Sequence, residues 1–82
     1  MITVKLYGLF RLETEKPVYQ FEAAKDVNAA LELLAKESKL SLDDWKKAVI
    51  YINGTAIDKL NMFRTKLKDG DVLSVLSPAS GG

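Results

Sequence analysis

The sequence contains neither cysteine nor histidine. Without cysteine, the chain has no disulfides, iron–sulfur clusters, thiolate metal sites or cysteine nucleophiles. Without histidine, it lacks the usual general base at neutral pH and any histidine-based catalytic triad. Carboxylates and lysines remain, but no pair of them is forced together by its spacing. The composition therefore predicts a protein that is not an enzyme by itself and has no metal site.

Basic tracts and long apolar runs are also missing. The formal net charge is +1, and the lysines and arginines are dispersed along the chain. No cluster of positive charge is present to neutralise the phosphates of a nucleic acid. No apolar stretch approaches membrane-spanning length, and the first residues carry no export signal. We therefore expect a cytoplasmic protein that binds neither nucleic acid nor a membrane.

The length of 82 residues is that of one small domain. We predict a single domain over residues 1–82, in which residues 77–82 form a flexible C-terminal tail. Apolar and charged residues are balanced as in ordinary globular proteins, so we expect a packed core.

The first third of the chain has the pattern of two strands. Apolar and polar residues alternate over residues 2–7 and again over residues 18–22, with Tyr19 and Phe21 on one face of the second strand. We expect these strands to form a hairpin. The connection over residues 9–16 is predicted to be an irregular, increasingly polar excursion.

Helical periodicity begins after Lys25. Asp26 is a good N-cap, and Val27, Ala30, Leu31 and Leu34 fall on one stripe. This predicts one amphipathic helix over residues 26–38, which needs a sheet to cover its apolar stripe.

The next segment begins with the capping-box sequence Ser41-Leu42-Asp43-Asp44, which predicts a short helical turn carrying Trp45. Trp45 is interpreted as a plug at the end of the core, with ligand stacking as the alternative.

The remaining elements are strands. We predict them over residues 48–52, 55–57 and 72–76, and Asn53-Gly54 predicts a type I′ hairpin turn between the first two. Residues 58–65 are expected to connect the strands, anchored by Leu60, Met62 and Phe63.

The order of these elements indicates an α+β fold of the β-grasp type, a mixed sheet covered by one main helix. In this arrangement the first and last strands lie parallel at the centre of the sheet. Alternation then assigns these residues to the helix-facing side: Ile2, Val4, Leu6, Ile50, Ile52, Leu73 and Val75.

The opposite, open face of the sheet is expected to carry Tyr7, Tyr51, Ser74 and Leu76. Tyr51 and Leu76 are candidates for a partner-binding patch. The alternative is that they are scattered single exposures, which are common on protein surfaces.

The end of the chain is the strongest functional feature. A turn at Asp69-Gly70-Asp71 precedes the last strand, Pro78 prevents further strand pairing, and Gly81-Gly82 follows. Two residues without side chains make a thin tip that can enter a narrow channel. Such a tip can bring its carboxylate to the α-phosphate of a nucleotide.

These motifs resemble a known family. The run Val49–Gly54, then Thr65–Asp71, then a strand and Ser77–Gly82, looks like the ubiquitin-like sulfur carriers. Within them the chain is most similar to the small subunit of molybdopterin synthase (the MoaD type), and the thiazole-synthesis carrier (the ThiS type) is the nearest sister. The resemblance covers the whole chain in element order, and it implies a ubiquitin-like β-grasp fold.

The resemblance also implies a chemistry. In that family a ubiquitin-activating-like enzyme (the MoeB/ThiF type) uses ATP to adenylate the last glycine, which is then converted to a thiocarboxylate. The sulfur serves molybdenum or tungsten cofactor biosynthesis on the large subunit of molybdopterin synthase (the MoaE type). By this resemblance Gly81 and Gly82 form the reactive tail, and no cofactor is bound by the chain itself. The implied partner-binding positions are Leu76, Tyr51, Pro78 and Ser80.

Other functions remain open at this point. A thiazole-pathway carrier has the same tail, and so does a ubiquitin-like modifier conjugated to other proteins through Gly82. A plain β-grasp interaction domain with an incidental Gly-Gly end belongs to a different class, because this fold hosts unrelated functions.

Overall fold

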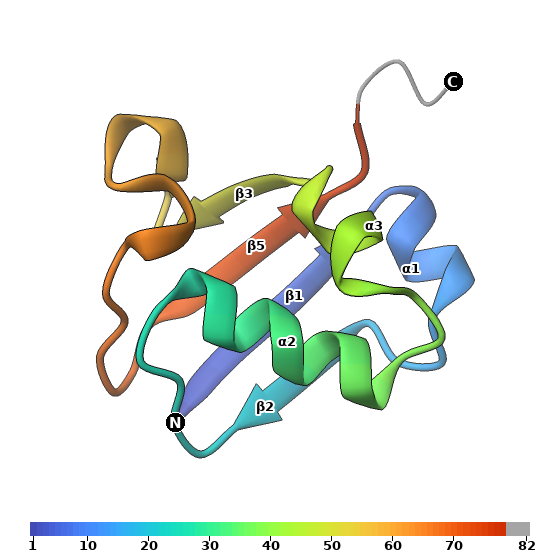
Figure 1. The fold of residues 1–82 in the computed structure, drawn as a ribbon. Coiled ribbons are helices and arrows are strands. Elements are labelled where there is room, and N and C mark those ends of the chain that lie inside the picture. The colour runs from blue at the N-terminus through green and yellow to red at the C-terminus, as the bar shows by residue number, and fades with distance from the viewer. Residues whose placement is uncertain (79–82) are drawn as a thin grey trace.

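The computed structural model describes residues 1–78, which contain a five-stranded mixed sheet with one main helix across one of its faces (Figure 1). The strand order is β2-β1-β5-β3-β4. This confirms the predicted α+β arrangement. The elements are β1 (Ile2–Tyr7), α1 (Leu9–Glu13), β2 (Val18–Phe21), α2 (Val27–Glu37), α3 (Leu42–Lys46), β3 (Val49–Ile52), β4 (Thr55–Ala56), the 3₁₀ turns η1 (Ile57–Lys59) and η2 (Met62–Arg64), and β5 (Val72–Leu76).

The first and last strands form the middle of the sheet. β1 and β5 run parallel, with Val4 opposite Leu73, and the other neighbouring strands are antiparallel. Val4 and Leu73 are completely buried, because alternation along both strands sends them to the helix-facing side. The predicted inward-facing set is confirmed.

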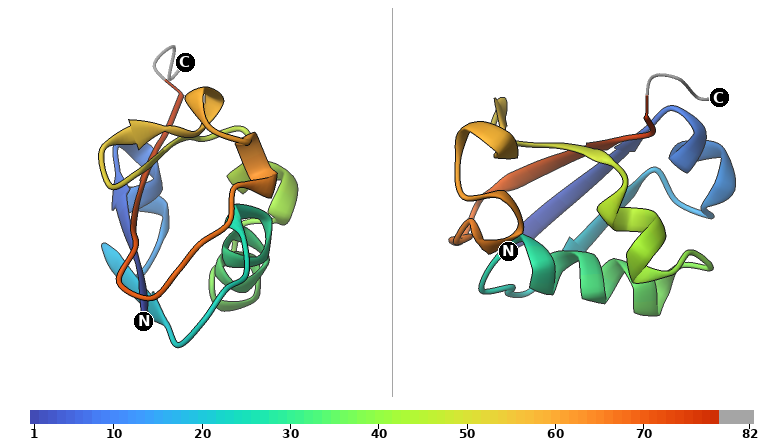
Figure 2. Two further views of the ribbon diagram at one scale, coloured as in Figure 1. Left: turned by 90° about the vertical axis from the view of Figure 1, so that its left-hand side faces the viewer. Right: turned by 45° about the horizontal axis from the view of Figure 1, so that its top comes forward.

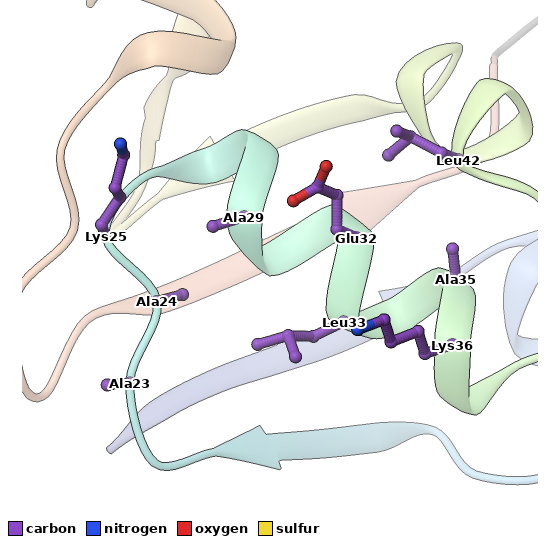
Figure 3. Close-up of a pocket in the computed structure, with 9 residues that line it drawn as sticks. All are labelled: Ala23, Ala24, Lys25, Ala29, Glu32, Leu33, Ala35, Lys36 and Leu42. Carbon is purple, nitrogen blue, oxygen red and sulfur yellow. The ribbon is translucent and has the colours of Figure 1, made fainter.

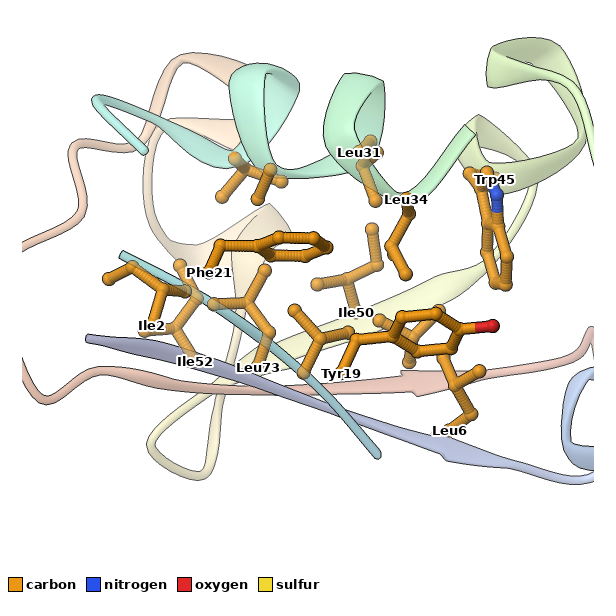
Figure 4. Close-up of a cluster of buried hydrophobic side chains, with 14 of the residues drawn as sticks. Ile2, Leu6, Tyr19, Phe21, Leu31, Leu34, Trp45, Ile50, Ile52 and Leu73 are labelled. Atoms are coloured by element: carbon orange, nitrogen blue, oxygen red, sulfur yellow. The ribbon is translucent and has the colours of Figure 1, made fainter. Parts of the chain in front are cut away.

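The helix α2 begins and ends as the sequence predicts. The Asp26 carboxylate accepts a hydrogen bond of 2.8 Å from the backbone N–H of Ala29, which satisfies a donor of the first turn. The apolar stripe of α2 is fully buried against the sheet. Figure 2 shows the two layers edge-on. In Figure 4, side chains from both layers, among them Leu31 and Leu73, fill the space between the helix and the sheet.

The single tryptophan closes one end of this core. Ser41 and Asp44 form the predicted capping box at the start of α3. Trp45 is fully buried, and its indole N–H donates to the Ser38 hydroxyl at 3.1 Å. Its ring lies 4.7 Å from that of Phe10. The interpretation of Trp45 as a core plug is confirmed.

Three local predictions need correction. The segment predicted to be an irregular excursion contains the short helix α1. Phe10 of this helix is buried beside Trp45, a packing partner that is distant in the sequence. Leu60 and Met62 are exposed, so the prediction that they anchor the connection after β4 was wrong. Ile57 is buried there instead, at the start of η1 and not at the end of a strand.

The tight turn between β3 and β4 has the predicted form. Asn53 has a φ of 50° and Gly54 a φ of 89°, which matches the positive φ values of a type I′ turn. The turn brings Tyr51 opposite Ala56. None of the helices among residues 1–78 is long and apolar enough to cross a membrane.

Candidate functional site

The point where the chain leaves the sheet is the centre of the candidate site. β5 ends at Leu76, opposite Tyr7 at the end of β1, because these strands run parallel in register. Ser77 and Pro78 follow beside α1 (Figure 1). The predicted tail residues Gly81 and Gly82, and the predicted contact Ser80, lie outside the described residues.

A row of apolar side chains crosses the open face of the sheet at this end. The strand registers place Val49 opposite Leu76 and Leu76 opposite Tyr7. Val49 and Tyr7 are exposed at 41% and 43%, and Leu76 between them is partly buried. We call Tyr7, Leu76 and Val49 the exit row, because the chain leaves the sheet beside it.

Tyr51 lies on the same face as the exit row. It pairs with Ser74, two positions before Leu76, so Tyr51 and Leu76 are diagonal neighbours on adjacent strands. Aromatic side chains reach such neighbours. The predicted location of Tyr51 and Leu76 on one face is confirmed, and their role in partner binding stays a prediction.

Sequence reasoning missed Val49 as a member of this surface. Val49 is two positions from Tyr51 in β3, so alternation alone assigns both to one face. Its position beside Leu76 depends on the antiparallel register of β3 with β5. The two strands are far apart in the sequence, and no local signal specifies that register.

A hydrogen bond holds the first residue after the strand. The backbone N–H of Leu9 donates to the Ser77 hydroxyl at 3.0 Å. Gly8 has a φ of 66°, and a Cβ placed on it would lie 2.3 Å from Ser77 Oγ. The flexible tail was predicted to begin at Ser77. In the structure the Ser77 side chain contacts the start of α1.

Pro78, a predicted partner contact, is exposed. It lines a shallow groove of about 180 Å³ between α1 and α3, together with Phe10, Glu13, Leu40, Asp44 and Lys47. Its lining thus combines apolar side chains with charged side chains of both signs. It adjoins the point where the chain passes beyond Pro78.

A larger hollow of about 570 Å³ lies over α2 (Figure 3). It runs between the chain segment Ala23–Lys25 and the helix, and its lining includes Leu33 and Leu42 with small alanine side chains. Glu32 and Lys36 are its charged members on α2. The residues named above for the chain exit do not line this hollow.

Among the described residues, two side chains have pKa values shifted by local hydrogen bonds or by burial. Hydrogen bonds from the Ser41 backbone N–H, then from its hydroxyl, lower the pKa of Asp44 below 3.8. Burial raises the pKa of Tyr19, with smaller contributions from Glu15 and Glu37. Within residues 1–78 no group of three or more acidic side chains is arranged to hold a metal ion.

Comparison with protein families decides the assignment. The model of the ThiS family matches residues 4–82, nearly the whole chain. The chain belongs to the ThiS family. The match begins within β1, runs through β5 and continues to the Gly-Gly end. A comparison with curated protein sequences gave no match.

Solved structures similar to this ThiS-family chain include a modifier protein and a chain of a molybdopterin-converting factor complex. The small archaeal modifier protein 1 (SAMP1) from Methanosarcina acetivorans has a TM-score of 0.86 and 27% identity, covering 99% of this chain and 95% of that one. A chain in the complex of subunits 1 and 2 of molybdopterin-converting factor from Helicobacter pylori has a TM-score of 0.65 and 32% identity, covering 99% and 97%.

A third structure supports the fold alone. The BexX/CysO complex from Amycolatopsis orientalis matches with a TM-score of 0.76 and 19% identity over 100% of both chains. This ThiS-family chain therefore has the ubiquitin-like β-grasp fold that sulfur carriers and protein modifiers share. Two of these three neighbours are parts of protein–protein complexes.

Proposed function

We propose that this chain is a cytoplasmic sulfur carrier whose C-terminal Gly82 is converted to a thiocarboxylate. It donates this sulfur in molybdopterin biosynthesis as the small subunit of molybdopterin synthase, and it is not an enzyme by itself. The observation that carries the proposal is the family match through Gly82. The 32% identity to a chain of the molybdopterin-converting factor complex favours the molybdopterin pathway.

The proposed chemistry has two steps. A carboxylate oxygen of Gly82 attacks the α-phosphorus of ATP, and pyrophosphate leaves as the acyl-adenylate forms. Sulfide (HS⁻) then attacks the acyl carbon, AMP leaves with the bridging oxygen, the proton passes to solvent, and a carbon–sulfur bond replaces that carbon–oxygen bond. Because AMP is a far better leaving group than an oxide ion, adenylation makes this exchange feasible. A MoeB/ThiF-type partner supplies the nucleotide site and stabilises the developing charge.

The arrangement of the exit row supports a carrier role. Leu76 both ends β5 and lies between Tyr7 and Val49 on the open face. A partner that docks on the exit row therefore contacts the residue from which the tail departs. We propose that the same surface, with Tyr51, Pro78 and Ser80, meets the adenylating enzyme and the MoaE-type large subunit in turn.

Mass spectrometry tests the carrier chemistry directly. The chain is incubated with ATP, the adenylating enzyme of the same organism and a sulfide source, and then cleaved after Lys68. The resulting fragment, residues 69–82, contains no methionine, so oxidation of Met1 or Met62 cannot imitate the exchange of oxygen for sulfur. We expect a mass gain equal to this exchange, located at Gly82.

Two variants serve as controls for this experiment. Deletion of Gly81 and Gly82 should abolish the mass gain while the domain stays folded. Gly82→Ala should also fold normally, and should block activation by adding bulk to the tip. As a positive control, the adenylating enzyme must be shown to activate a carrier that it is known to use. If the wild-type fragment then stays unmodified, the proposal is ruled out.

A second candidate function is protein modification through Gly82. The likeness to small archaeal modifier protein 1, with a TM-score of 0.86 and 27% identity, favours it. The activation step is the same, but the acyl group passes to a lysine amine and forms an isopeptide bond. Affinity-tagged chain recovered from cells distinguishes the two functions. Conjugates that disappear on deletion of Gly81 and Gly82 indicate a modifier, whereas free thiocarboxylate without conjugates indicates a carrier.

The acceptor is tested separately. The thiocarboxylate form is mixed with the MoaE-type subunit and its pterin precursor, and in a parallel reaction with thiazole synthase and its substrates. Sulfur transfer in the first reaction alone supports the molybdopterin pathway, and transfer in the second alone supports the thiazole pathway. A plain interaction domain is supported if deletion of Gly81 and Gly82 changes no activity of the chain in cells.

A further inference from the structure

The hydrogen bond between Leu9 and Ser77 joins two segments that are 68 positions apart in the sequence. It forms at the end of the parallel pair β1 and β5, directly after the last registered pair of Tyr7 with Leu76. β1 turns away from the sheet at Gly8, so the main-chain ladder cannot continue to Ser77. The side-chain hydroxyl makes the next connection in place of the ladder.

The local backbone is adapted to this contact. A Cβ at position 8 would lie 2.3 Å from Ser77 Oγ, closer than two such atoms can approach. Gly8 also has a φ of 66°, which favours glycine. The absent side chain therefore leaves the space that the Ser77 hydroxyl occupies.

The Ser77–Leu9 hydrogen bond connects the place where the chain leaves the sheet to the hydrophobic core. α1 has no side-chain cap from its own N-cap residue, Gly8, so the Ser77 hydroxyl satisfies a donor of the first turn that would otherwise lack a protein partner. Phe10, one residue further along α1, is buried against Trp45. The start of the tail is thus linked through α1 to a fully buried side chain.

We propose that Ser77 is a positioning residue, whose hydrogen bond to Leu9 fixes where and in which direction the reactive tail leaves the sheet. This inference rests on the proposed function of Gly82. From Ser77, the five residues to Gly82 span at most roughly 18 Å, at about 3.3–3.6 Å each. A fixed starting point limits the volume that so short a segment searches, which raises the effective concentration of its carboxylate at a docked partner's nucleotide.

The test compares Ser77→Ala with wild-type chain in adenylate formation, measured as ATP–pyrophosphate exchange with the adenylating enzyme. A neutral hydrogen bond of ordinary net strength corresponds to roughly a 2- to 10-fold change in an equilibrium. We expect kcat at saturating carrier to fall by a factor in this range. KM should stay within about twofold, because the docking face is unchanged. Ser77→Thr keeps the hydroxyl and should restore kcat.

Two further measurements separate positioning from a general effect on stability. Hydrogen exchange of the Leu9 amide should accelerate in Ser77→Ala and not in Ser77→Thr. Thr3→Ala removes a hydroxyl from the far end of β1 and serves as the control for loss of a hydroxyl from the sheet. Gly8→Ala should lower kcat much more in the wild-type background than in the Ser77→Ala background, because both changes remove the same contact.

The possible outcomes are distinct. A reduced kcat in Ser77→Ala, rescued by threonine and accompanied by faster exchange at Leu9, supports the inference. Wild-type kcat in Ser77→Ala overturns it, as does an unchanged exchange rate at Leu9. If wild-type chain is itself never adenylated by an active cognate enzyme, the proposed function of Gly82 fails, and this inference fails with it.

Discussion

The side chains of Asn53 and Asp71 are joined by a hydrogen bond of 3.0 Å, from the Asn53 amide nitrogen to a carboxylate oxygen of Asp71. The other carboxylate oxygen of Asp71 accepts from the Lys68 N–H at 2.9 Å, and the Asn53 amide oxygen accepts from the Val72 N–H at 3.0 Å. Together these bonds connect the β3–β4 turn to the start of β5. They also explain why a carboxylate is buried at this position.

Replacement of Asp71 should therefore destabilise the fold. Asp71 is only 5% exposed, so Asp71→Ala leaves the Asn53 and Lys68 donors without their acceptor. We expect a loss of roughly 1–3 kcal/mol in the free energy of unfolding. Urea denaturation measures it. Asp69→Ala is the matched control from the same loop, because its carboxylate is 88% exposed and, within residues 1–78, pairs only with the exposed amino group of Met1. Equal losses in the two variants would contradict this account.

The central strand pair should be the most sensitive part of the core. Leu73 is completely buried opposite Val4, so Leu73→Ala leaves a cavity between the sheet and α2. The expected loss is about 2–5 kcal/mol in the free energy of unfolding. Thermal and urea denaturation both measure it. Leu12→Ala, at an 80% exposed position, should change stability by less than about 0.5 kcal/mol.

The exit row should determine partner affinity without affecting the fold. Val49 and Val18 are both 41% exposed on the open face, but Val49 adjoins Leu76, whereas Val18 lies on the edge strand β2. Val49→Lys places a charge in the proposed contact, and we expect about tenfold weaker binding to the adenylating enzyme or large subunit, near 1.4 kcal/mol. Titration calorimetry measures the affinity. Val18→Lys should bind within about twofold of wild type, and an equal loss in both variants would refute a contact centred on the exit row.

Acid should weaken the cap of α3 through Asp44. The two hydrogen bonds from Ser41 lower the pKa of this carboxyl group below 3.8 in the folded state. A lowered folded-state pKa means that the ionised group contributes stability above its unfolded pKa, and that this contribution disappears as the pH falls through the folded value. The stability difference between wild type and Asp44→Asn should therefore shrink when urea denaturation is moved from about pH 6 to about pH 3. A difference that is constant over this range would contradict the assignment, and Asp43→Asn in the same turn provides the control.

Much of this fold could be predicted from local sequence patterns. Asp26 and the apolar stripe after it specified α2, because capping and helical periodicity act within a few residues. Asn53 and Gly54 specified their turn for the same reason. Helix α1 was not predicted, because its contacts are made with Ser77 and Trp45, which are both distant from it in the sequence. Leu60 and Met62 look like core residues by type, yet both are exposed and Ile57 is buried nearby instead.

The candidate site likewise has one part that local sequence patterns predict and one part that they do not. Alternation within β3 and β5 was enough to assign Tyr51 and Leu76 to one face. Alternation was not enough to predict the exit row. Val49 and Tyr7 lie beside Leu76 only because of the order and register of three strands. The contact of Ser77 with Leu9 had no sequence signal, since a serine before a proline suggests only the start of a tail.

The parallel pairing of β1 and β5 has a consequence for synthesis of the protein on the ribosome. β1 is made before β5, yet β5 is its central neighbour in the sheet and the last strand among the described elements. The β1–β2 hairpin and α2 can form early, yet Val4 and its neighbours have no parallel partner until residues 72–76 have left the ribosome. Contacts this distant in sequence slow folding, because the intervening chain must be closed into a loop before they form. The nascent chain therefore carries an incomplete sheet until β5 has emerged, and a chain that stops before Val72 lacks the strand that completes it.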